Sequence, residues 1–554
     1  MAEPPPTAGR PRPVLAWHGP VLLALAYALH CRVLNYVSDD GFISFRYVQN
    51  WLAGNGMVYN AGERVEGYTN FLWVAFLGAV MRILPALDLL RLAQFSGILF
   101  GCLTIWLVCR CSRTVAGETG PWSLLAGAFL AVHTSFVAWA TSGLETLMFA
   151  LLLFSAAYAY AASMQSGRGF LPSAVLFALL PMVRPDGLLL VGVTGFHFLV
   201  RECRSKGWPG LKRPIAWGLV VVAIYGAYFA ARHAYYGQLL PNTFYAKVMT
   251  GTNQYALGWK YLRSYFLMNG AFVFLPAIWL LLRRGRRAWR DYFALLVFAY
   301  LGYILYVGGD GLAFFRFVAH IAPLLYLLVQ DGYAELYRTT RRRLPRVPHW
   351  SIGSALGALI VISLAFTTSQ SARVMLFPER HRWLEKHSEL RFPGLGTDHD
   401  YRWFDNYFVD RQKVAARWLE QNAPANSLVA STPAGSIAYH MSHRVIDMLG
   451  LNDLHIAHTE SGEIGFPRAG HMKGDGKYVL SRRPDFILLG NVAVLPFALD
   501  RERFAAKLVR KSEHEIWAEP EFHRDYELVS VRLQEEGVFQ FFNFYRLREG
   551  RSQR

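Results

Sequence analysis

Residues 92–109 read LAQFSGILFGCLTIWLVC, a run without a single charged side chain. As an α-helix, such a run is about long enough to cross the roughly 30 Å hydrocarbon core of a bilayer. Runs of similar character recur at 17–34, 122–140, 145–163, 215–234, 265–282, 291–307, 313–330 and 351–369. This repetition predicts a mainly α-helical, polytopic membrane bundle.

Two shorter apolar runs, 171–183 and 187–200, meet at the polar turn Arg184-Pro185-Asp186-Gly187. They are expected to form either a helical hairpin that crosses only part of the membrane or two tilted spans. In both cases the two runs together return the chain to the side of the membrane on which the first run began.

The character of the chain changes after residue 370. Residues 1–370 hold 31 Lys+Arg and 14 Asp+Glu, whereas residues 371–554 hold 26 and 25. The formal net charge of +18 therefore belongs to the membrane half, where it lies in short loops between apolar runs. This placement is typical of membrane topology and argues against nucleic-acid binding. We expect a transmembrane domain at 1–370 and a second domain at 371–554.

Clusters of basic residues mark cytoplasmic loops, because Lys and Arg are enriched on that side of a membrane. The strongest clusters lie at 201–213, 283–290 and 338–346, and two apolar runs separate each from the next. Arg10 and Arg12 fall on the same side only if the short run 71–85 does not span the membrane. We expect 71–85 to be an interfacial helix within a first outer loop at 35–91.

This arrangement predicts about 11 spans, a cytoplasmic N-terminus and an extracytoplasmic C-terminal domain. Polar turns of both signs then gather at the outer end of the bundle. Their charged residues are Asp39, Asp40, Glu63, Glu66, Glu145, Asp186 and Asp310, with Arg46, Arg64, Arg184, Lys247 and Arg316. Such charges are costly near lipid unless they line a wet cavity, and they commonly mark a substrate path. Helix caps and headgroup-level loop charges are the structural explanation for part of this set.

The richest of these turns follows the first apolar run and begins Ser38-Asp39-Asp40-Gly41. Ser38 or Asp39 is a suitable cap for a short helix that starts near Gly41, which is the structural explanation. Two adjacent carboxylates are otherwise unfavourable unless they share a proton, a cation or a ligand. Such a carboxylate is suited to act as general base towards a hydroxyl group. It is also suited to hold a divalent cation, Mg²⁺ or Mn²⁺, beside a phosphate.

An ordered set of motifs runs through the membrane half. In the first loop these are Asp39-Asp40-Gly41, Arg46, Asn50 to Gly56, Val58, Asn60, Gly62 to Glu66, and Thr69. The set continues with Ala140 to Glu145, Val183-Arg184-Pro185, Tyr235-Tyr236-Gly237, Leu240-Pro241, Thr243 and Ala246-Lys247, and more loosely with Asp447 to Leu451. Together they resemble the mycobacterial terminal β-(1→2)-arabinofuranosyltransferase family, whose members are GT-C-fold glycosyltransferases that use polyprenyl-phosphate-linked sugars.

The resemblance implies a multi-pass protein of the bacterial inner (plasma) membrane. It implies transfer of a sugar from a polyprenyl-phosphate donor to a hydroxyl of an envelope glycan, a lipid-linked glycan or a protein, on the extracytoplasmic face. Asp39 and Asp40 match the family's acidic pair, one of which is the expected general base or charge-stabilising residue for the acceptor hydroxyl. No cofactor is implied by the resemblance, and whether a divalent cation, Mg²⁺ or Mn²⁺, bridges this pair stays open.

The leaving polyprenyl phosphate needs cations, and Arg suits bidentate contact with phosphate. Lys247 and Arg316 are the first candidates for this role, followed by Arg184. Interfacial snorkelling of Lys247 and a topological charge at Arg316 are the structural alternatives. The rest of the candidate donor site consists of Glu145, Arg64, Glu66 and Thr69.

The sequence departs from the family at two places. Gly67-Tyr68-Thr69-Asn70 stands where Ala-Asn-Thr-Ser is expected, and Asp186-Gly187 stands where Glu-Leu is expected. These departures leave the donor sugar open. Arabinofuranose is favoured, a hexose such as mannose is the alternative within the same class, and a lipid-linked sugar flippase or transporter is the alternative outside it.

From residue 371 helical and strand-like segments alternate, which is typical of a small α/β domain. A helix is expected at Gln412–Asn422 and strands at Ser427–Ser431, Arg444–Met448 and Phe486–Leu489. The turn at 433–436 leads into a helix whose N-terminus is suited to bind an anion. We expect the domain to cap the site and to bind part of the acceptor. Its candidate contacts are Asp447, Asn452, Asp453, His455, His471, Trp403 and Tyr407.

Overall fold

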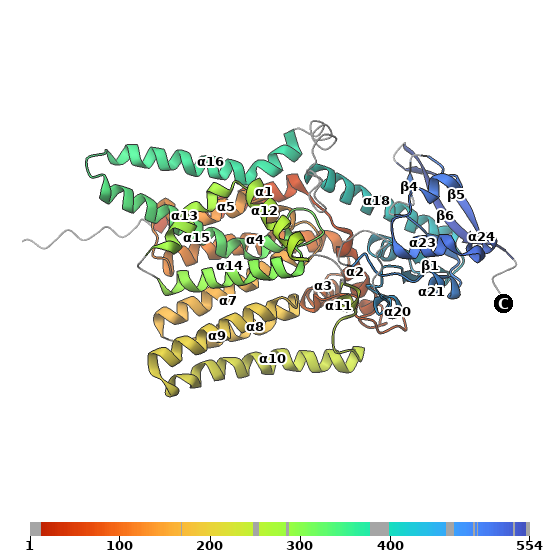
Figure 1. The fold of residues 1–554 in the computed structure, drawn as a ribbon, viewed down its shortest axis with the longest axis horizontal. Coiled ribbons are helices and arrows are strands. Elements are labelled where there is room, and N and C mark those ends of the chain that lie inside the picture. The colour runs from red at the N-terminus through yellow and green to blue at the C-terminus, as the bar shows by residue number, and fades with distance from the viewer. Residues whose placement is uncertain are drawn as a thin grey trace, which may run out of the picture.

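The computed structural model describes residues 13–167, 169–247, 254–283, 287–376, 398–460, 470–490, 494–495, 497–535 and 538–549. The first part of the chain forms an elongated helical bundle, and a smaller domain with a β-sheet packs against one end of it (Figure 1). The bundle and the smaller domain are thus distinct in space. They meet at one end of the bundle only.

Long helices make up most of the bundle. They are α1 (Pro13–Leu34), α4 (Leu89–Thr114), α7 (Thr146–Ser166), α8 (Phe170–Val183), α9 (Gly187–Lys206), α10 (Lys212–Tyr236), α14 (Ala288–Val307), α15 (Arg316–Arg343) and α16 (His349–Leu376). Shorter helices complete it: η1 (Gly120–Leu124), α5 (Leu125–Val132), α6 (Thr134–Ala138), η2 (Trp208–Leu211), α12 (Gln254–Met268), η3 (Ala271–Phe274) and α13 (Leu275–Leu282).

Five of the described helices are long and apolar enough to cross a membrane, and up to seven spans result if each of two bent pairs counts as one. The bent pairs are His18–Leu34 with Asp39–Leu52 and Gln254–Met268 with Ala271–Leu282, at 98° and 90°. The protein is therefore a multi-pass membrane protein, as predicted. The count of about 11 spans stays a prediction, because several helices of the bundle are shorter or more charged than a simple span.

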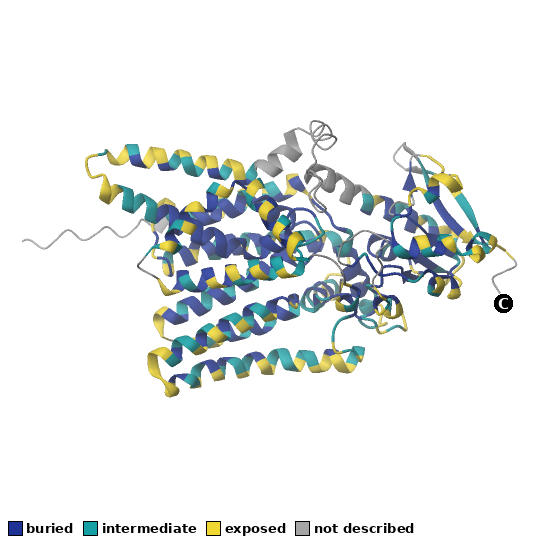
Figure 2. Cartoon of the chain, in the orientation of Figure 1, coloured by how far each residue is buried: buried dark blue, intermediate teal, exposed yellow. Residues whose placement is uncertain are grey.

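Helix α15 is the centre of the bundle. Its side chains from Arg316 to Ala334 are buried, whereas α10 at the edge keeps large apolar side chains such as Leu219 and Val222 exposed. Figure 2 shows this gradient from a buried centre to exposed outer helices. Exposed apolar side chains on the outer helices are expected where lipid replaces water.

Three short helices lie at the bundle end that faces the second domain: α2 (Asp39–Leu52), α3 (Phe71–Ile83) and α11 (Asn242–Lys247). Helix α3 corresponds to the predicted interfacial run 71–85 and buries Trp73, Val74 and Leu77. It is an apolar helix of 13 residues, too short for a simple span. Its position relative to the lipid surface stays a prediction.

The second domain begins with α18 (Asp398–Asn422) and contains a six-stranded mixed sheet in the order β2-β1-β3-β6-β4, with β5 paired to β6. The strands are β1 (Leu428–Ser431), β2 (Arg444–Asp447), β3 (Phe486–Leu488), β4 (Val494–Leu495), β5 (Tyr526–Glu535) and β6 (Val538–Leu547). The small helices are α19 (Ser436–Tyr439), α20 (Leu454–Ala457), α21 (Gly476–Ser481), α22 (Arg501–Ala505), α23 (Lys511–Ala518) and α24 (Pro520–Asp525).

Strands β1, β2 and β3 are parallel and coincide with the three strands predicted from the sequence. Strands β4, β5 and β6 add an antiparallel part that was not predicted. The α/β class of this domain is therefore confirmed. The predicted helix at Gln412–Asn422 is the last part of α18.

Arg46 of α2 fixes the second domain to the bundle. Its guanidinium donates to the backbone carbonyls of Ala438, Met441 and His443 in the second domain, and to that of Tyr59 in its own loop. The side chain is only 7% exposed. Because a charged donor shared among buried carbonyls is a strong set of hydrogen bonds, this residue holds the junction in one arrangement.

Candidate functional site

The predicted outer turns meet at the junction between the bundle and the second domain. The backbone N–H of Ser38 donates to the carbonyl of Ser142, at 3.0 Å. A Cβ placed on Gly41 would lie 3.3 Å from Gly143, whose φ is +89°. The close approach of these two glycines brings the start of α2 against the turn that precedes α7. Two motifs far apart in sequence thereby form one surface.

The neighbouring carboxylates Asp39 and Asp40 have different surroundings. Asp39 accepts hydrogen bonds from the backbone N–H groups of Ser436 and Gly435, at 2.7 and 3.2 Å. The anion predicted at the start of the helix after 433–436 is thus a carboxylate of the protein itself. Ser38 precedes α2 but makes no capping bond with its side chain, and the helix begins at Asp39. Asp39 therefore joins the domains.

Asp40 acts on basic residues of the bundle instead. It is partly buried, and its negative charge acts on Lys247 and Arg316. Of the two carboxylates, Asp40 is thus the one coupled electrostatically to the predicted phosphate-binding cations. The two carboxylates therefore have different environments. Their adjacency in the sequence had indicated a shared one.

Arg184 is held between two carboxylates at the end of α8. It donates to Glu145 at 2.8 Å and to Asp186 at 3.1 Å. The second oxygen of Glu145 accepts from the side-chain amide of Asn70, at 2.8 Å. Glu145 precedes α7 but does not cap it with its side chain. The predicted donor-site residues Arg184 and Glu145 are therefore brought together, and Asn70 connects them to the first loop.

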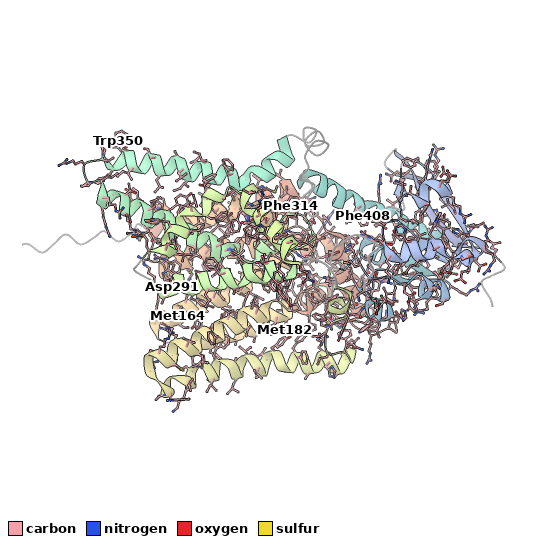
Figure 3. The ribbon with its side chains drawn as sticks, viewed as in Figure 1. Met164, Met182, Asp291, Phe314, Trp350 and Phe408 are labelled. Atoms are coloured by element: carbon pink, nitrogen blue, oxygen red, sulfur yellow. The ribbon has the colours of Figure 1, made fainter. Side chains whose placement is uncertain are left out.

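Arg316 opens α15 beside Asp310, to which it donates at 2.7 Å. The two residues before it, Phe314 and Phe315, have φ values of +56° and +46°, a conformation that phenylalanine rarely adopts. The guanidinium carbon of Arg316 also lies 5.4 Å from the ring centre of Trp139. The first turn of α15 follows these two left-handed residues. It lies at the bundle end that meets the second domain, where Figure 3 labels Phe314. Strain of this kind is concentrated at functional sites.

Lys247 ends the short helix α11. Its side chain is accessible to solvent, and it lies 3.5 Å from the position of a Cβ on Gly470 of the second domain. Although the side chain keeps accessible surface, the protein packed around it desolvates the ammonium group and lowers its pKa, and the negative charge of Asp40 opposes that shift. The other charges that act on Lys247 are Arg316, Arg184 and Asp310. An accessible cation among these groups is suited to meet an anionic ligand.

The remaining predicted donor-site residues lie elsewhere in the first loop. Arg64 is exposed and covers the ring of Tyr235 at 4.9 Å. Glu66 is buried in an ion pair with Arg232 of α10, at 2.6 Å. Burial raises the pKa of Glu66 to about 6, although Arg232 opposes this shift. Thr69 is half-buried next to Asn70. Glu66 thus anchors the loop to α10, and Arg64 lies at its surface.

The sequence reasoning missed two contributors. Arg232 is a lone cation inside the apolar run 215–234, which is itself a signal, because a charge within a span needs a buried partner. Tyr300 of α14 donates to Asp186 at 2.5 Å and contacts His320 of α15 at 2.7 Å. Nothing in the sequence marks Tyr300 among the many tyrosines of the chain. It extends the Glu145–Arg184–Asp186 group into the bundle.

Among the polar candidates of the second domain, Asn452 contacts the first loop. Asp447 accepts from the backbone N–H groups of Leu449 and Asn452, and the Asn452 amide oxygen lies against Gly67. His455 stacks on Tyr478 with ring centres 4.0 Å apart. The side chains of Trp403 and Tyr407 lie outside the described residues. Asp447 and Asn452 therefore act in the junction itself.

Asp39 and Asp40 do not form a metal site by themselves. Across the described part of the chain, no three His, Cys, Asp or Glu side chains gather as metal ligands. Asp39 already accepts two backbone N–H groups, and Asp40 is left as a single carboxylate opposite cations. A divalent cation usually needs several oxygen ligands. The divalent cation therefore stays a prediction, and no step below is assigned to one.

Two curated proteins have similar sequences. The chain is 31% identical over 327 residues to the terminal β-(1→2)-arabinofuranosyltransferase of Corynebacterium glutamicum, covering 50% of this chain and 45% of that protein. It is 28% identical over 273 residues to the protein of the same name from Mycobacterium tuberculosis, covering 46% and 41%. The chain thus spans less than half the length of these relatives.

Among solved structures, ArnT from Cupriavidus metallidurans bound to undecaprenyl phosphate aligns with a TM-score of 0.52 and 15% identity, covering 78% of this chain and 85% of ArnT. The apo structure of the same protein gives 0.51, again at 15% identity, and covers 79% and 86%. This chain has a GT-C fold. The predicted fold class is therefore confirmed. Separately, residues 401–548 match a domain of unknown function, DUF8728.

Proposed function

We propose that this GT-C protein is a membrane glycosyltransferase that transfers a sugar from a polyprenyl-phosphate donor to a hydroxyl group, with arabinofuranose as the favoured sugar. The observation that carries the proposal is the solvent-accessible Lys247, which lies among Asp40, Arg184 and Arg316 at the end of the bundle. The likeness to two arabinofuranosyltransferases and the GT-C fold support it.

Lys247 and Arg316 are assigned to the donor phosphate. When the bond between the sugar and the phosphate breaks, negative charge develops on the leaving polyprenyl phosphate. Cations fixed beforehand at that place stabilise the charge without reorganisation. Arg184 is committed to Glu145 and Asp186, so its part is to hold the carboxylates in place and to add positive potential. Arg316 keeps guanidinium N–H groups beyond the one that meets Asp310.

Asp40 is assigned as the general base. It receives the proton of the acceptor hydroxyl while the hydroxyl oxygen forms the new glycosidic bond and polyprenyl phosphate departs. Asp39 cannot serve equally well, because its oxygens accept the N–H groups of Gly435 and Ser436. Hydrogen bonds of this kind stabilise the charged carboxylate and make it a weaker base. In this proposal Asp40 acts in the transfer reaction. Asp39 instead binds the second domain to the bundle.

The second domain covers this site from outside the bundle. Gly470 lies beside Lys247, and Asn242 of α11 donates to the carbonyls of Gly450 and Leu451. We assign the acceptor, an envelope glycan, a lipid-linked glycan or a protein, to the side of the junction on which Asp40 lies. In this proposal the second domain and the acceptor lie on the extracytoplasmic side of the bacterial inner membrane, and the N-terminus is cytoplasmic.

The sugar is tested with a panel of donors. Membranes from cells that express the full chain are incubated with polyprenyl-phosphoryl arabinofuranose or polyprenyl-phosphoryl mannose, and acceptor products are analysed by mass spectrometry. We expect pentose transfer from the first donor, and its loss in the Asp40→Asn variant. Hexose transfer instead would keep the class and change the sugar. Movement of intact donor across vesicles without bond cleavage would replace the transferase by a transporter.

A further inference from the structure

Helix α11 carries Lys247 but is only six residues long. A helix of this length is not stable alone, because its first turn costs more conformational entropy than its few hydrogen bonds recover. The place of α11 therefore depends on contacts with other parts of the chain. Asn242, Thr243 and Ala246 are buried, whereas Lys247 is exposed at the end of the helix. Figure 1 shows α11 beside α20, at the bundle end that meets the second domain.

Arg232 holds the turn that leads from α10 into α11. Its guanidinium donates to the backbone carbonyls of Gln238 and Leu239, at 3.2 and 3.0 Å. The residue is 7% exposed and lies within an apolar run, where a charge is costly unless it is paired. Arginine side chains often bond the last carbonyls of a helix. These two bonds are therefore sufficient to explain a cap, and they do not by themselves indicate a role in transfer.

Glu66 of the first loop adds contacts that a helix cap does not require. Its carboxylate pairs with the guanidinium of Arg232 at 2.6 Å. Its backbone carbonyl accepts from the N–H of Asn242 at 3.0 Å. Glu66 is 4% exposed. One buried residue thus contacts the chain on both sides of the turn, near the end of α10 and at the first residue of α11.

Asn242 connects the start of α11 to the second domain as well. Its side-chain amide donates to the carbonyls of Gly450, Leu451 and Asp453, at 2.9, 3.0 and 3.2 Å. The first residue of α11 is therefore held by the first loop through its backbone and by the second domain through its side chain. Lys247 follows about 7.5 Å further along the helix, at 1.5 Å per residue. A displacement of Asn242 would consequently move Lys247 too.

The ion pair between Glu66 and Arg232 is not explained by stability alone. Burial removes both charges from water, and replacing such a pair by apolar side chains is often neutral or stabilising. A better attested use of a buried pair is to fix one arrangement among several.

We propose that Glu66 and Arg232 are positioning residues, which hold α11 so that the ammonium group of Lys247 lies at the place assigned to the donor phosphate. The inference rests on the proposed function, in which Lys247 meets that phosphate. Glu66, predicted from the sequence as a donor contact, here acts on the donor only through α11.

Hydrogen exchange of the full-length protein in detergent tests the positioning itself. We expect peptides from Asn242–Lys247 to exchange faster in Glu66→Gln and in Arg232→Met than in the wild type, while peptides from α15 keep their protection. Glu66→Gln nearly keeps the size of the side chain and removes its charge. Arg82→Met is the matched control, because it removes an exposed cation of α3, and it should exchange as the wild type does.

Unchanged exchange of Asn242–Lys247 in both variants overturns the proposal. Loss of protection in α15 would show that Arg232→Met is destabilised throughout, and Glu66→Gln then decides the result.

A double-mutant cycle with Lys247→Met connects the positioning to transfer. We expect Arg232→Met and Glu66→Gln each to lower kcat/KM for transfer from polyprenyl-phosphoryl arabinofuranose by about 10- to 100-fold, as for a small displacement of a reacting group. In the Lys247→Met background the same changes should cost less than about twofold, because the group that they position is absent. A purely structural effect would instead be as large in that background as in the wild type.

The outcomes separate this inference from the proposed function. If the losses multiply in the double variants, Glu66 and Arg232 act independently of Lys247, which overturns the inference and leaves the function intact. If the wild type transfers no sugar, or Lys247→Met keeps the wild-type rate, the phosphate role fails and the inference fails with it. Faster exchange of α11 together with losses that do not multiply supports the inference.

Discussion

The adjacent residues Asp39 and Asp40 have different partners in the fold. Ser38-Asp39-Asp40-Gly41 marks a site in the sequence, but only the fold separates the two carboxylates. Asp39 accepts from Gly435 and Ser436, which are almost four hundred residues away, whereas the charge of Asp40 acts on Lys247. No local pattern can reveal a partner at that distance. The sequence could therefore predict the motif and not the division of roles within it.

Asp40→Asn and Asp39→Asn should consequently have different effects. Loss of a general base typically costs about 10²–10⁴-fold in rate, so we expect a loss of that size in kcat for Asp40→Asn with an unchanged unfolding midpoint. Asp39→Asn should lower stability by about 1 kcal/mol and reduce kcat less. Steady-state transfer rates and thermal unfolding measure both. Equal kcat losses in the two variants would contradict the division.

Lys247 can be tested by charge removal with little change in size. Lys247→Met should weaken stabilisation of the leaving phosphate and reduce kcat/KM by about 10²-fold, as for loss of one preorganised charge contact. Arg64→Gln, an exposed cation of the same end, serves as the control and should retain its rate. Transfer kinetics at several donor concentrations give the comparison. Wild-type kcat/KM in Lys247→Met would rule out the assigned phosphate role.

At the scale of elements, the loop after β2 connects the second domain to the first loop. Asp447 holds this loop by accepting from Leu449 and Asn452, and Asn242 of α11 donates to its carbonyls. Strand β2 was predicted from its apolar run and β-branched residues. The contacts of the loop were not predictable, because they depend on the orientation of α11 and the first loop. Elements were thus easier to predict than their junction.

The pH dependence of stability tests the burial of Asp447. Burial raises its pKa to about 6, while the N–H groups of Asn452 and Leu449 oppose this shift. A raised pKa means that the folded protein prefers the protonated form. This contribution is complete below the unfolded pKa and is lost as pH rises through about 6. Because the pKa rises from 3.8 to about 6 on folding, the stability lost is on the order of 3 kcal/mol.

Unfolding free energies measured between pH 4 and pH 7 should therefore fall with pH more steeply in the wild type than in Asp447→Asn. The comparison uses the slope of the unfolding free energy against pH, because Asp447→Asn also changes the absolute free energy of unfolding. Parallel slopes for the two proteins would show that Asp447 titrates normally.

The contact between α2 and the second domain can be tested at Arg46. Arg46→Ala removes a charged donor from carbonyls of Ala438, Met441 and His443, and hydrogen bonds to charged groups contribute about 1.5–3 kcal/mol each. We expect faster proteolytic release of the second domain and a lower unfolding midpoint. Arg64→Ala is the control for loss of an arginine in the same loop region. Identical cleavage rates in both variants would show that Arg46 does not hold the domains together.

For the whole molecule, hydropathy and charge were sufficient to predict the fold class, a helical membrane bundle with a second domain. The apolar runs predicted the helical bundle, and the change in composition after residue 370 predicted the second domain. The number of spans was harder to predict, because α3 is short and the segments Gln254–Met268 and Ala271–Leu282 are bent by 90°. The antiparallel strands β5 and β6 were missed because aromatic residues and charges mix in their sequence.

The orientation in the membrane follows from the basic loops and can be measured. All five cysteines lie in the membrane half, at Cys31, Cys102, Cys109, Cys111 and Cys203. A cysteine introduced at the exposed Ser481 side chain of the second domain should react with a membrane-impermeant maleimide in spheroplasts. One introduced at the exposed Arg343 should react only after lysis. The wild-type chain gives the background, and the reverse pattern would invert the proposed topology.

The central claim is that the charged group around Lys247 and Asp40 transfers a sugar. The most direct measurement uses purified full-length protein with polyprenyl-phosphoryl arabinofuranose and a hydroxyl acceptor, and follows both products by mass spectrometry. The account predicts one polyprenyl phosphate released for each pentose gained by the acceptor, with both products lost in Asp40→Asn. Intact donor after prolonged incubation with a folded protein and suitable acceptors, or equal product formation by Asp40→Asn, would contradict it.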